Sequence, residues 1–246
     1  MKKENRIPKV IHYCWFGKNP IPKSLKKCIK SWEKYCPDYE IKQWNEENFD
    51  INCNEFVREA YENKAWAFVS DYARLWIIYN NGGIYLDTDV EIVKNIDELL
   101  KYDCYLAEQQ YANNVATGLG FGAQKHNQTI KLMLEEYENL KFDIDKKNEI
   151  ICPILNTRAI EKEYNYIYSN DIIYYEKINT IIFPPKYFDP LAPGISEDLL
   201  CDETYSIHHY SATWTSKNNR LRRRIIQLIG QKNVNNLKKI IRNKKG

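Results

Sequence analysis

The chain has 246 residues, of which 43% are hydrophobic and 28% are charged. This length is enough for one domain with a large core, and the composition excludes a wholly disordered or low-complexity protein. The best apolar run, residues 75–79, is far shorter than the roughly 18 residues that a membrane-spanning helix needs. The basic N-terminal residues are followed by no apolar stretch, so we expect no secretory signal and a cytoplasmic protein.

The charge is divided unevenly along the chain. The net charge is +3, but residues 217–246 contain eleven of the 36 basic residues and none of the 33 acidic ones, which leaves −8 on residues 1–216. We therefore predict a folded domain over 1–216 and a basic, amphipathic helical tail over 217–246. The seven cysteines are scattered without a C-x-x-C pair, which indicates reduced and mostly buried thiols.

Strand-like and helix-like segments alternate in the first half, as is typical of an α/β domain with a largely parallel sheet. Apolar alternation and runs indicate the strands, and helical periodicity indicates the helices. Gly82 and Gly83 provide the end of the longest helix. The predicted segments are strands at 10–16, 39–44, 84–86 and 90–93, and helices at 21–35, 53–63 and 65–80.

The second half gives a weaker pattern. Glycines at 118, 120 and 122 indicate a strand or turn whose backbone packs closely against a neighbour. Prolines at both ends of residues 183–194 indicate a loop. The remaining segments are helices at 127–141 and 153–164, a last strand at 206–210 and two short basic helices within 219–243.

Asp87 and Asp89 stand just after the strand predicted at 84–86. Side chains two residues apart in a strand point to the same side, so the two carboxylates can share a hard divalent ion such as Mg²⁺ or Mn²⁺ and, through it, a diphosphate. A D-x-D pair is also common in solvated turns, and for these two residues alone that alternative stays open.

The preceding helix carries Ser70, Asp71 and Arg74, and the last two share a face at i, i+3. They form either a surface ion pair worth at most about 1 kcal/mol or a ligand site. Arg74 would then neutralise phosphate or sugar oxygens, and Asp71 would hold a ligand hydroxyl. Apolar neighbours such as Phe68 and Trp76 favour the ligand site.

Four segments together carry a family resemblance: 7–17, 70–90, 117–123 and 206–214. In this order they resemble the bacterial glycosyltransferases with a sugar-binding D-x-D region, which include transferases of capsular-polysaccharide synthesis. The family is similar to the yeast initiating mannosyltransferase and, more remotely, to the glucosyltransferase domains of clostridial toxins. The resemblance implies a GT-A (Rossmann-like) fold, a nucleotide-sugar donor, Mn²⁺ or Mg²⁺, and retention of the anomeric configuration.

The resemblance also implies roles for residues that would bind the donor. Trp15 would stack on the uracil ring, although core packing would explain a tryptophan there equally well. Ser70 and Tyr85 would line the donor pocket, although a tyrosine on a strand is usually a core residue. Asp71 and Arg74 would hold the sugar hydroxyls and the diphosphate.

Further roles concern the metal and the leaving group. Asp87 would contact the ribose and the water shell of the metal, and Asp89 would bind the metal directly. His209 would be a further ligand, with the choice between it and His208 left open. Trp214 would donate its indole N–H to the phosphate bridge. Asp71, Arg74, Asp89 and Trp214 are thus the residues expected to carry catalysis, with no protein nucleophile named.

Two residues depart from the family pattern: Ala116 stands where asparagine is expected, and Cys152 where glycine is expected. The sugar and the acceptor therefore stay open. The sequence predicts a retaining, metal-dependent transfer of a sugar from a UDP-sugar to a surface polysaccharide or another glycan, including a lipid-linked oligosaccharide. Alternatives are a nucleotidyltransferase, which would release pyrophosphate, and a non-catalytic glycan-binding module.

The basic tail interleaves cationic and apolar residues, a pattern that suits an anionic membrane surface. A solvated helical tail that packs on the domain is almost equally compatible with it. Nucleic acid would also attract such a stripe, but the acidic body and the lack of a nucleic-acid motif argue against that partner. We expect peripheral contact with the inner face of the plasma membrane.

Overall fold

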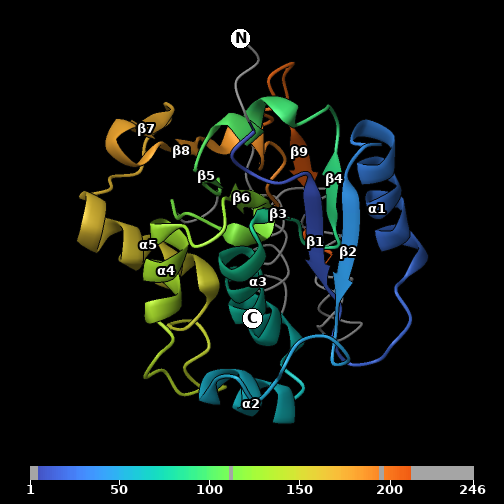
Figure 1. Ribbon diagram of the computed structural model, residues 1–246, viewed down its shortest axis with the longest axis vertical. Helices are drawn as coiled ribbons and strands as arrows, with labels where there is room; N and C mark the ends of the chain where they lie inside the picture. Colours follow the sequence, from blue (N-terminus) through green and yellow to red (C-terminus); the bar gives the residue numbers. More distant parts are fainter. Residues whose placement is uncertain (1–4, 111–112, 194–196, 212–246) are drawn as a thin grey trace, which may run out of the picture.

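The computed structural model describes residues 5–110, 113–193 and 197–211 (Figure 1). A mixed sheet of seven strands forms the centre of this part of the chain, and a second, two-stranded sheet lies beside it. The central sheet contains β1 (Val10–Cys14), β2 (Glu40–Trp44), β3 (Gly83–Tyr85), β5 (Cys104–Ala107), β6 (Phe121–Ala123), β7 (Ile173–Tyr175) and β8 (Thr180–Phe183). The small sheet pairs β4 (Val90–Ile92) with β9 (Ser206–His208).

The central sheet has the strand order β2-β1-β3-β6-β5-β8-β7. Strand β1 pairs in parallel with β2 and β3, and β5 pairs in parallel with β8. Strands β6 and β7 run antiparallel to their neighbours. Most strands therefore point the same way, and the predicted α/β class with a mostly parallel sheet is confirmed.

Helices cover both faces of the sheet. Figure 1 shows α3 in front of the sheet with α4 and α5 beside it, and α1 beside β4. Asn54 and Asn127 cap α2 and α4, because each side-chain oxygen accepts backbone N–H groups of the first turn. The helices are α1 (Lys23–Tyr35), α2 (Glu55–Glu62), α3 (Trp66–Asn81), α4 (Gln128–Glu135) and α5 (Cys152–Tyr164), with short 3-10 turns η1 (Asp97–Lys101), η2 (Thr117–Leu119), η3 (Glu176–Ile178) and η4 (Pro185–Tyr187).

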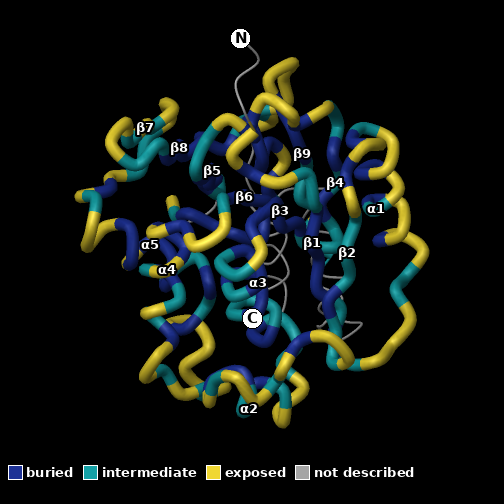
Figure 2. The backbone as a smooth tube through the Cα atoms, viewed as in Figure 1, coloured by how far each residue is buried: buried dark blue, intermediate teal, exposed yellow. Residues whose placement is uncertain are grey.

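The sheet separates two hydrophobic cores, because successive strand residues face opposite sides. In β5, Leu106 joins the core under α2 to α5, whereas Tyr105 joins the core on the α1 side. Strand β8 repeats this division with Ile182 and Ile181. Figure 2 shows the central strands almost wholly buried, with exposed backbone mainly in the outer loops. This buried sheet is the rigid base on which the loops at the strand ends are held.

The elements predicted for the first half agree with the structure to within a few residues. Beyond residue 93, β5, β7 and β8 were not predicted, and the helix expected at 127–141 ends at Glu135. The segment 183–194, expected as loop, begins with the last residue of β8 and contains η4. The tail at 217–246 lies outside the described residues.

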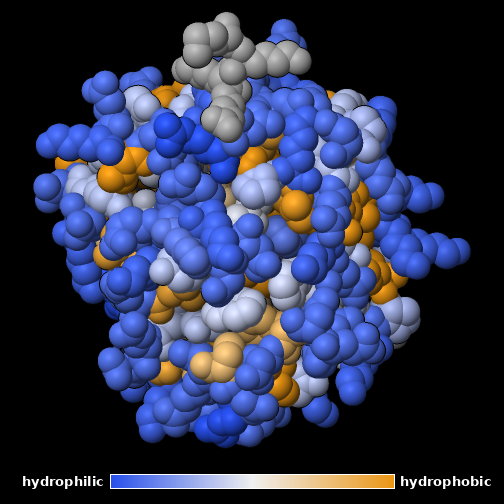
Figure 3. Space-filling view, viewed as in Figure 1, coloured by the Kyte–Doolittle hydropathy of each residue, from blue (hydrophilic) through white to orange (hydrophobic). Residues whose placement is uncertain are grey.

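The surface in Figure 3 is mainly hydrophilic, with small separate apolar patches. Among the described residues, no helix combines the length and the hydropathy that a bilayer span requires. All seven cysteines lie in the described ranges and are free thiols, and only Cys53 and Cys201 are exposed. The prediction of mostly buried cysteines is thus confirmed.

Candidate active site

A cavity of about 490 Å³ lies where β1 and β3 end. The two strands are parallel neighbours, so the residues that follow them, Trp15 and Asp87, meet at the same edge of the sheet. This carboxyl edge is where α/β folds place their ligands. The start of α3 and the segment after β9 complete the wall. Its polar part includes Lys64, Ser70, Arg74, Asp87, Asp89, His208 and Ser211, and its aromatic side chains include Trp15, Phe16 and Trp66.

Asp87 and Asp89 lie in a turn between β3 and β4, not on a strand. The Val90 N–H donates to the Asp87 carbonyl over 2.9 Å and closes this turn. The prediction that strand alternation brings the two carboxylates together is therefore wrong, because β3 ends at Tyr85, before both aspartates. The turn itself brings the two carboxylates to the cavity.

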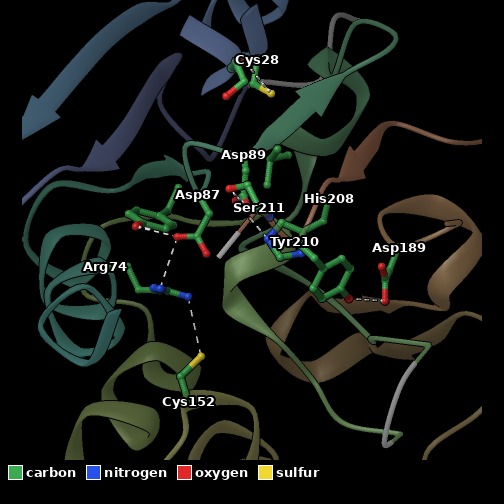
Figure 4. A network of polar contacts seen from close by, with 12 residues as sticks. Cys28, Arg74, Asp87, Asp89, Cys152, Asp189, His208, Tyr210 and Ser211 are labelled. Carbon is green, nitrogen blue, oxygen red and sulfur yellow. Dashed lines mark hydrogen bonds and ion pairs between the residues drawn. The ribbon is translucent and has the colours of Figure 1, made fainter. Parts of the chain in front are cut away.

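Asp89 is held from two sides (Figure 4). Its Oδ1 lies 3.1 Å from Nε2 of His208, and its Oδ2 accepts from the backbone N–H and the hydroxyl of Ser211 at 2.7 and 2.9 Å. Burial opposes ionisation, but the charge of His208 and these hydrogen bonds hold the pKa of Asp89 well below its usual value. Asp89 is thus a fixed anionic group at the cavity wall.

Arg74 is only 4% exposed and lies between two carboxylates. Its Nη2 is 2.9 Å from Oδ1 of Asp71 and 3.3 Å from Oδ1 of Asp87. Asp87 also accepts from the Tyr85 hydroxyl at 3.0 Å. Burial raises the pKa of Asp71 to about 6 and raises that of Asp87, while the charge of Arg74 opposes both shifts. The surface ion pair considered for Asp71 and Arg74 is in fact a buried charge cluster.

The segment after β9 brings an imidazole to the two aspartates. Ligand atoms of Asp87, Asp89 and His208 lie within 4.8 Å of one another, so these three groups could hold a metal ion. Carboxylate oxygens and an imidazole nitrogen suit Mn²⁺. His209, the predicted ligand, instead places its Nε2 2.8 Å from Glu91 and outside this cluster. The pairing of β4 with β9, with Val90 opposite His208, sets which histidine faces the aspartates.

Sequence reasoning missed the residues that support this segment. The hydroxyl of Tyr210 donates to Asp189 over 2.8 Å, and its ring lies 4.1 Å from that of His208 (Figure 4). Asp189 is fully buried and also accepts from the Gln110 N–H. Tyr210 and Ser211 stand inside the segment 206–214 that carried the resemblance, whereas no local pattern marks Asp189.

The other predicted residues have distinct positions. Trp15 and Ser70 line the cavity, so Trp15 is not a core residue; its indole N–H donates to the Asn19 carbonyl. Tyr85 is 1% exposed and reaches the site through its hydrogen bond to Asp87. Trp214 lies outside the described residues.

The two residues that depart from the family pattern are both buried. The Cys152 thiol accepts from Arg74 over 3.7 Å, so it lies behind the charge cluster. Ala116 is 4% exposed and immediately precedes η2.

A family model identifies the region that carries this geometry. Residues 22–106, about a third of the chain, match the family described as "Glycosyltransferase sugar-binding region containing DXD motif". This part of the chain is therefore similar to the sugar-binding region of glycosyltransferases, which agrees with the enzyme class predicted from the sequence. Asp71, Arg74, Asp87 and Asp89 fall inside the matched residues, whereas His208 and Ser211 fall outside them.

Particular relatives carry the same class in their names. Inositol phosphoceramide mannosyltransferase 3 of Schizosaccharomyces pombe is 34% identical over 108 residues, which are 41% of this chain and 29% of that protein. The uncharacterized glycosyltransferase L373 of Acanthamoeba polyphaga mimivirus is 32% identical over 100 residues, 38% of this chain and 40% of the relative. The chain thus spans about a third of the length of the curated relatives it matches.

Solved structures with a similar arrangement are more distant. A glycosyltransferase involved in the glycosylation of the major capsid of PBCV-1 gives a TM-score of 0.47 at 15% identity, over 87% of this chain and 97% of that one. The PaToxG glycosyltransferase gives 0.44 at 18% identity, over 65% and 70% of the two chains.

Proposed function

We propose that the protein is a GT-A glycosyltransferase that transfers a sugar from a nucleotide-diphosphate donor with the help of Mn²⁺ or Mg²⁺. One observation carries this proposal: the D-x-D carboxylates of the family-matched region converge with an imidazole at a cavity on the carboxyl edge of the sheet. The seven-stranded mixed sheet with helices on both faces supports the GT-A fold.

The cavity supports a nucleotide sugar as the ligand. Its volume of about 490 Å³ lies within the usual range of roughly 300–1,000 Å³ for small-molecule sites. Trp15 offers a flat surface for the base, and UDP is the expected nucleotide. The relatives from Schizosaccharomyces pombe are named as mannosyltransferases, so a nucleotide-linked mannose is the second candidate for the donor, after a UDP-sugar.

In this proposal, the metal is held by Asp89 and His208 with Asp87 beside them, so His208 replaces His209 in the predicted ligand set. The metal would supply positive charge to the departing diphosphate. Ser211 fixes the Asp89 carboxylate, and Arg74 fixes Asp87 while Asp71 holds Arg74. Trp214 remains the expected donor to the phosphate bridge.

The acceptor, the stereochemistry and the location are extensions of this proposal. A surface polysaccharide, including a capsule, or a lipid-linked glycan on the cytoplasmic side of a membrane would suit a cytoplasmic enzyme with a basic tail. We also expect the transfer to retain the anomeric configuration of the sugar. The donor reaction can be tested without any of these being known.

The test measures slow donor hydrolysis with UDP- and GDP-sugars and Mn²⁺, scored as free nucleoside diphosphate. We expect one donor to be hydrolysed, chelation to stop the reaction, and Asp89→Asn to lower the rate by about 100-fold or more, because an anionic metal ligand becomes a neutral one. The matched control is Glu91→Gln, an exposed acid-to-amide change that should keep the rate. Full activity of Asp89→Asn would refute the metal site, and pyrophosphate as the product would favour a nucleotidyltransferase.

A further inference from the structure

The corner between α2 and α3 contains a lysine in a backbone conformation that favours glycine. Lys64 has φ +56°, in the left-handed region. Its N–H donates to the Tyr61 carbonyl, and the next N–H, of Ala65, donates to the Ala60 carbonyl, both over 2.9 Å. This pair of bonds is the Schellman motif, and Lys64 stands at the position after the C-cap where glycine is the usual residue.

A side chain in this position lowers the stability of the corner, since L-residues are disfavoured in the left-handed region. Strained backbone of this kind is common at ligand sites, where the strain serves to place a group. Lys64 is one of the residues that line the cavity, together with Trp66 and Ala67 of the first turn of α3. The corner therefore places a lysine, where glycine would be more stable, at the cavity wall.

The charges around the cavity give this lysine a distinct position. Arg74 is paired with Asp71 and Asp87, and His208 is paired with Asp89. Within the described ranges, no carboxylate lies within 4.0 Å of the Lys64 ammonium group. Lys64 thus brings a positive charge to the cavity that those residues do not neutralise, and an anionic ligand would gain from it.

We propose that Lys64 binds a phosphate of the nucleotide diphosphate donor and so contributes to donor affinity and to the choice of diphosphate over nucleoside. This inference rests on the proposed function. It adds a cationic contact to those expected from the metal and from Arg74. It also explains why the corner accepts a lysine in place of glycine.

The structure provides a test that separates binding from folding. Lys64→Gly removes the ammonium group and installs the residue that the Schellman motif prefers, so the midpoint of thermal unfolding should not fall. Calorimetric titration with UDP in Mn²⁺ should show about tenfold weaker binding, equivalent to about 1.4 kcal/mol. Titration with uridine should give the same affinity as the unchanged protein, because uridine has no phosphate.

Lys18→Gly is the matched control, because Lys18 is also exposed, has φ +58° and stands near the cavity without lining it. It removes the same charge and should leave UDP affinity within about twofold. Equal UDP affinity of Lys64→Gly and the unchanged protein would overturn the inference, as would an equal loss in Lys18→Gly or a loss for uridine. If the unchanged protein binds no nucleoside diphosphate, the proposed function itself is wrong.

Discussion

The buried position of Arg74 leads to a large expected effect on stability. Substituting methionine would leave the carboxylates of Asp71 and Asp87 without their positive partner in a buried site. Removal of one partner of a buried ion pair costs about 3–5 kcal/mol. For a domain of this size that corresponds to a fall in the unfolding temperature of about 6–20 °C.

Arg58→Met is the matched control, because Arg58 forms exposed pairs with Glu55 and Glu62 on α2. Surface pairs contribute less than about 1 kcal/mol, so this variant should unfold within a few degrees of the unchanged protein. Thermal and urea unfolding at pH 5 and pH 8 would measure both variants.

The pH dependence follows from Asp71, whose pKa burial already raises to about 6. Its folded pKa lies above the unfolded one, so the folded state takes up the proton and stability is lost as the pH rises through the folded pKa. Without Arg74 this loss of stability with rising pH should grow, so Arg74→Met should be less stable at pH 8 than at pH 5. If Arg74→Met unfolded no earlier than Arg58→Met, the charge cluster would not have the energetic role argued for it.

Two further predictions concern Glu108 and Gly118. Burial raises the pKa of Glu108 to about 7, with hydrogen bonds from Tyr166 and Ser169 opposing the shift, so its stability contribution is present below about pH 4.5 and is lost as the pH rises through 7. In urea unfolding, Glu108→Gln should thus be about 1–3 kcal/mol more stable than the unchanged protein at pH 8, with little gain at pH 5. The control Glu138→Gln, at an exposed position, should leave the stability unchanged. An equal gain for Glu108→Gln at both pH values would contradict this reasoning. A Cβ on Gly118 would lie 2.7 Å from Asp87 Oδ2, so Gly118→Ala should displace that carboxylate. Donor hydrolysis should fall about tenfold or more while the circular dichroism spectrum stays unchanged, and Gly118→Ser should be at least as impaired. Full activity of the alanine variant would show that Asp87 can move without consequence.

Local patterns predicted those parts of the molecule whose residues are close in sequence. The strand β1 follows from an apolar run, β2 from alternation, and the helices α1 and α3 from local start and stop signals. Asp71 and Arg74 share a face because one helix carries both. The strands β5, β7 and β8 have only three or four residues each, and their ends carry no marks like the Gly82–Gly83 pair and the D-x-D pair that bound the equally short β3 and precede β4.

Long-range pairing determined what the sequence left open in the site. His208 faces the aspartates and His209 faces Glu91 because of how β9 pairs with β4, which no window around either histidine reveals. Likewise, the burial of Arg74 depends on α5, which places the Cys152 thiol against the guanidinium. Asp189 and Ser211 contribute only through contacts made across the fold.

The pairing of β4 with β9 determines when, during synthesis, the residues around Asp89 can come together. His208 follows Asp89 by 119 residues, so during synthesis the two aspartates leave the ribosome long before the imidazole. A nascent chain that ends soon after the family-matched region has the carboxylates but not the nitrogen donor or the serine that orients Asp89. The cluster of Asp87, Asp89 and His208 is therefore completed late, when the last described strand docks.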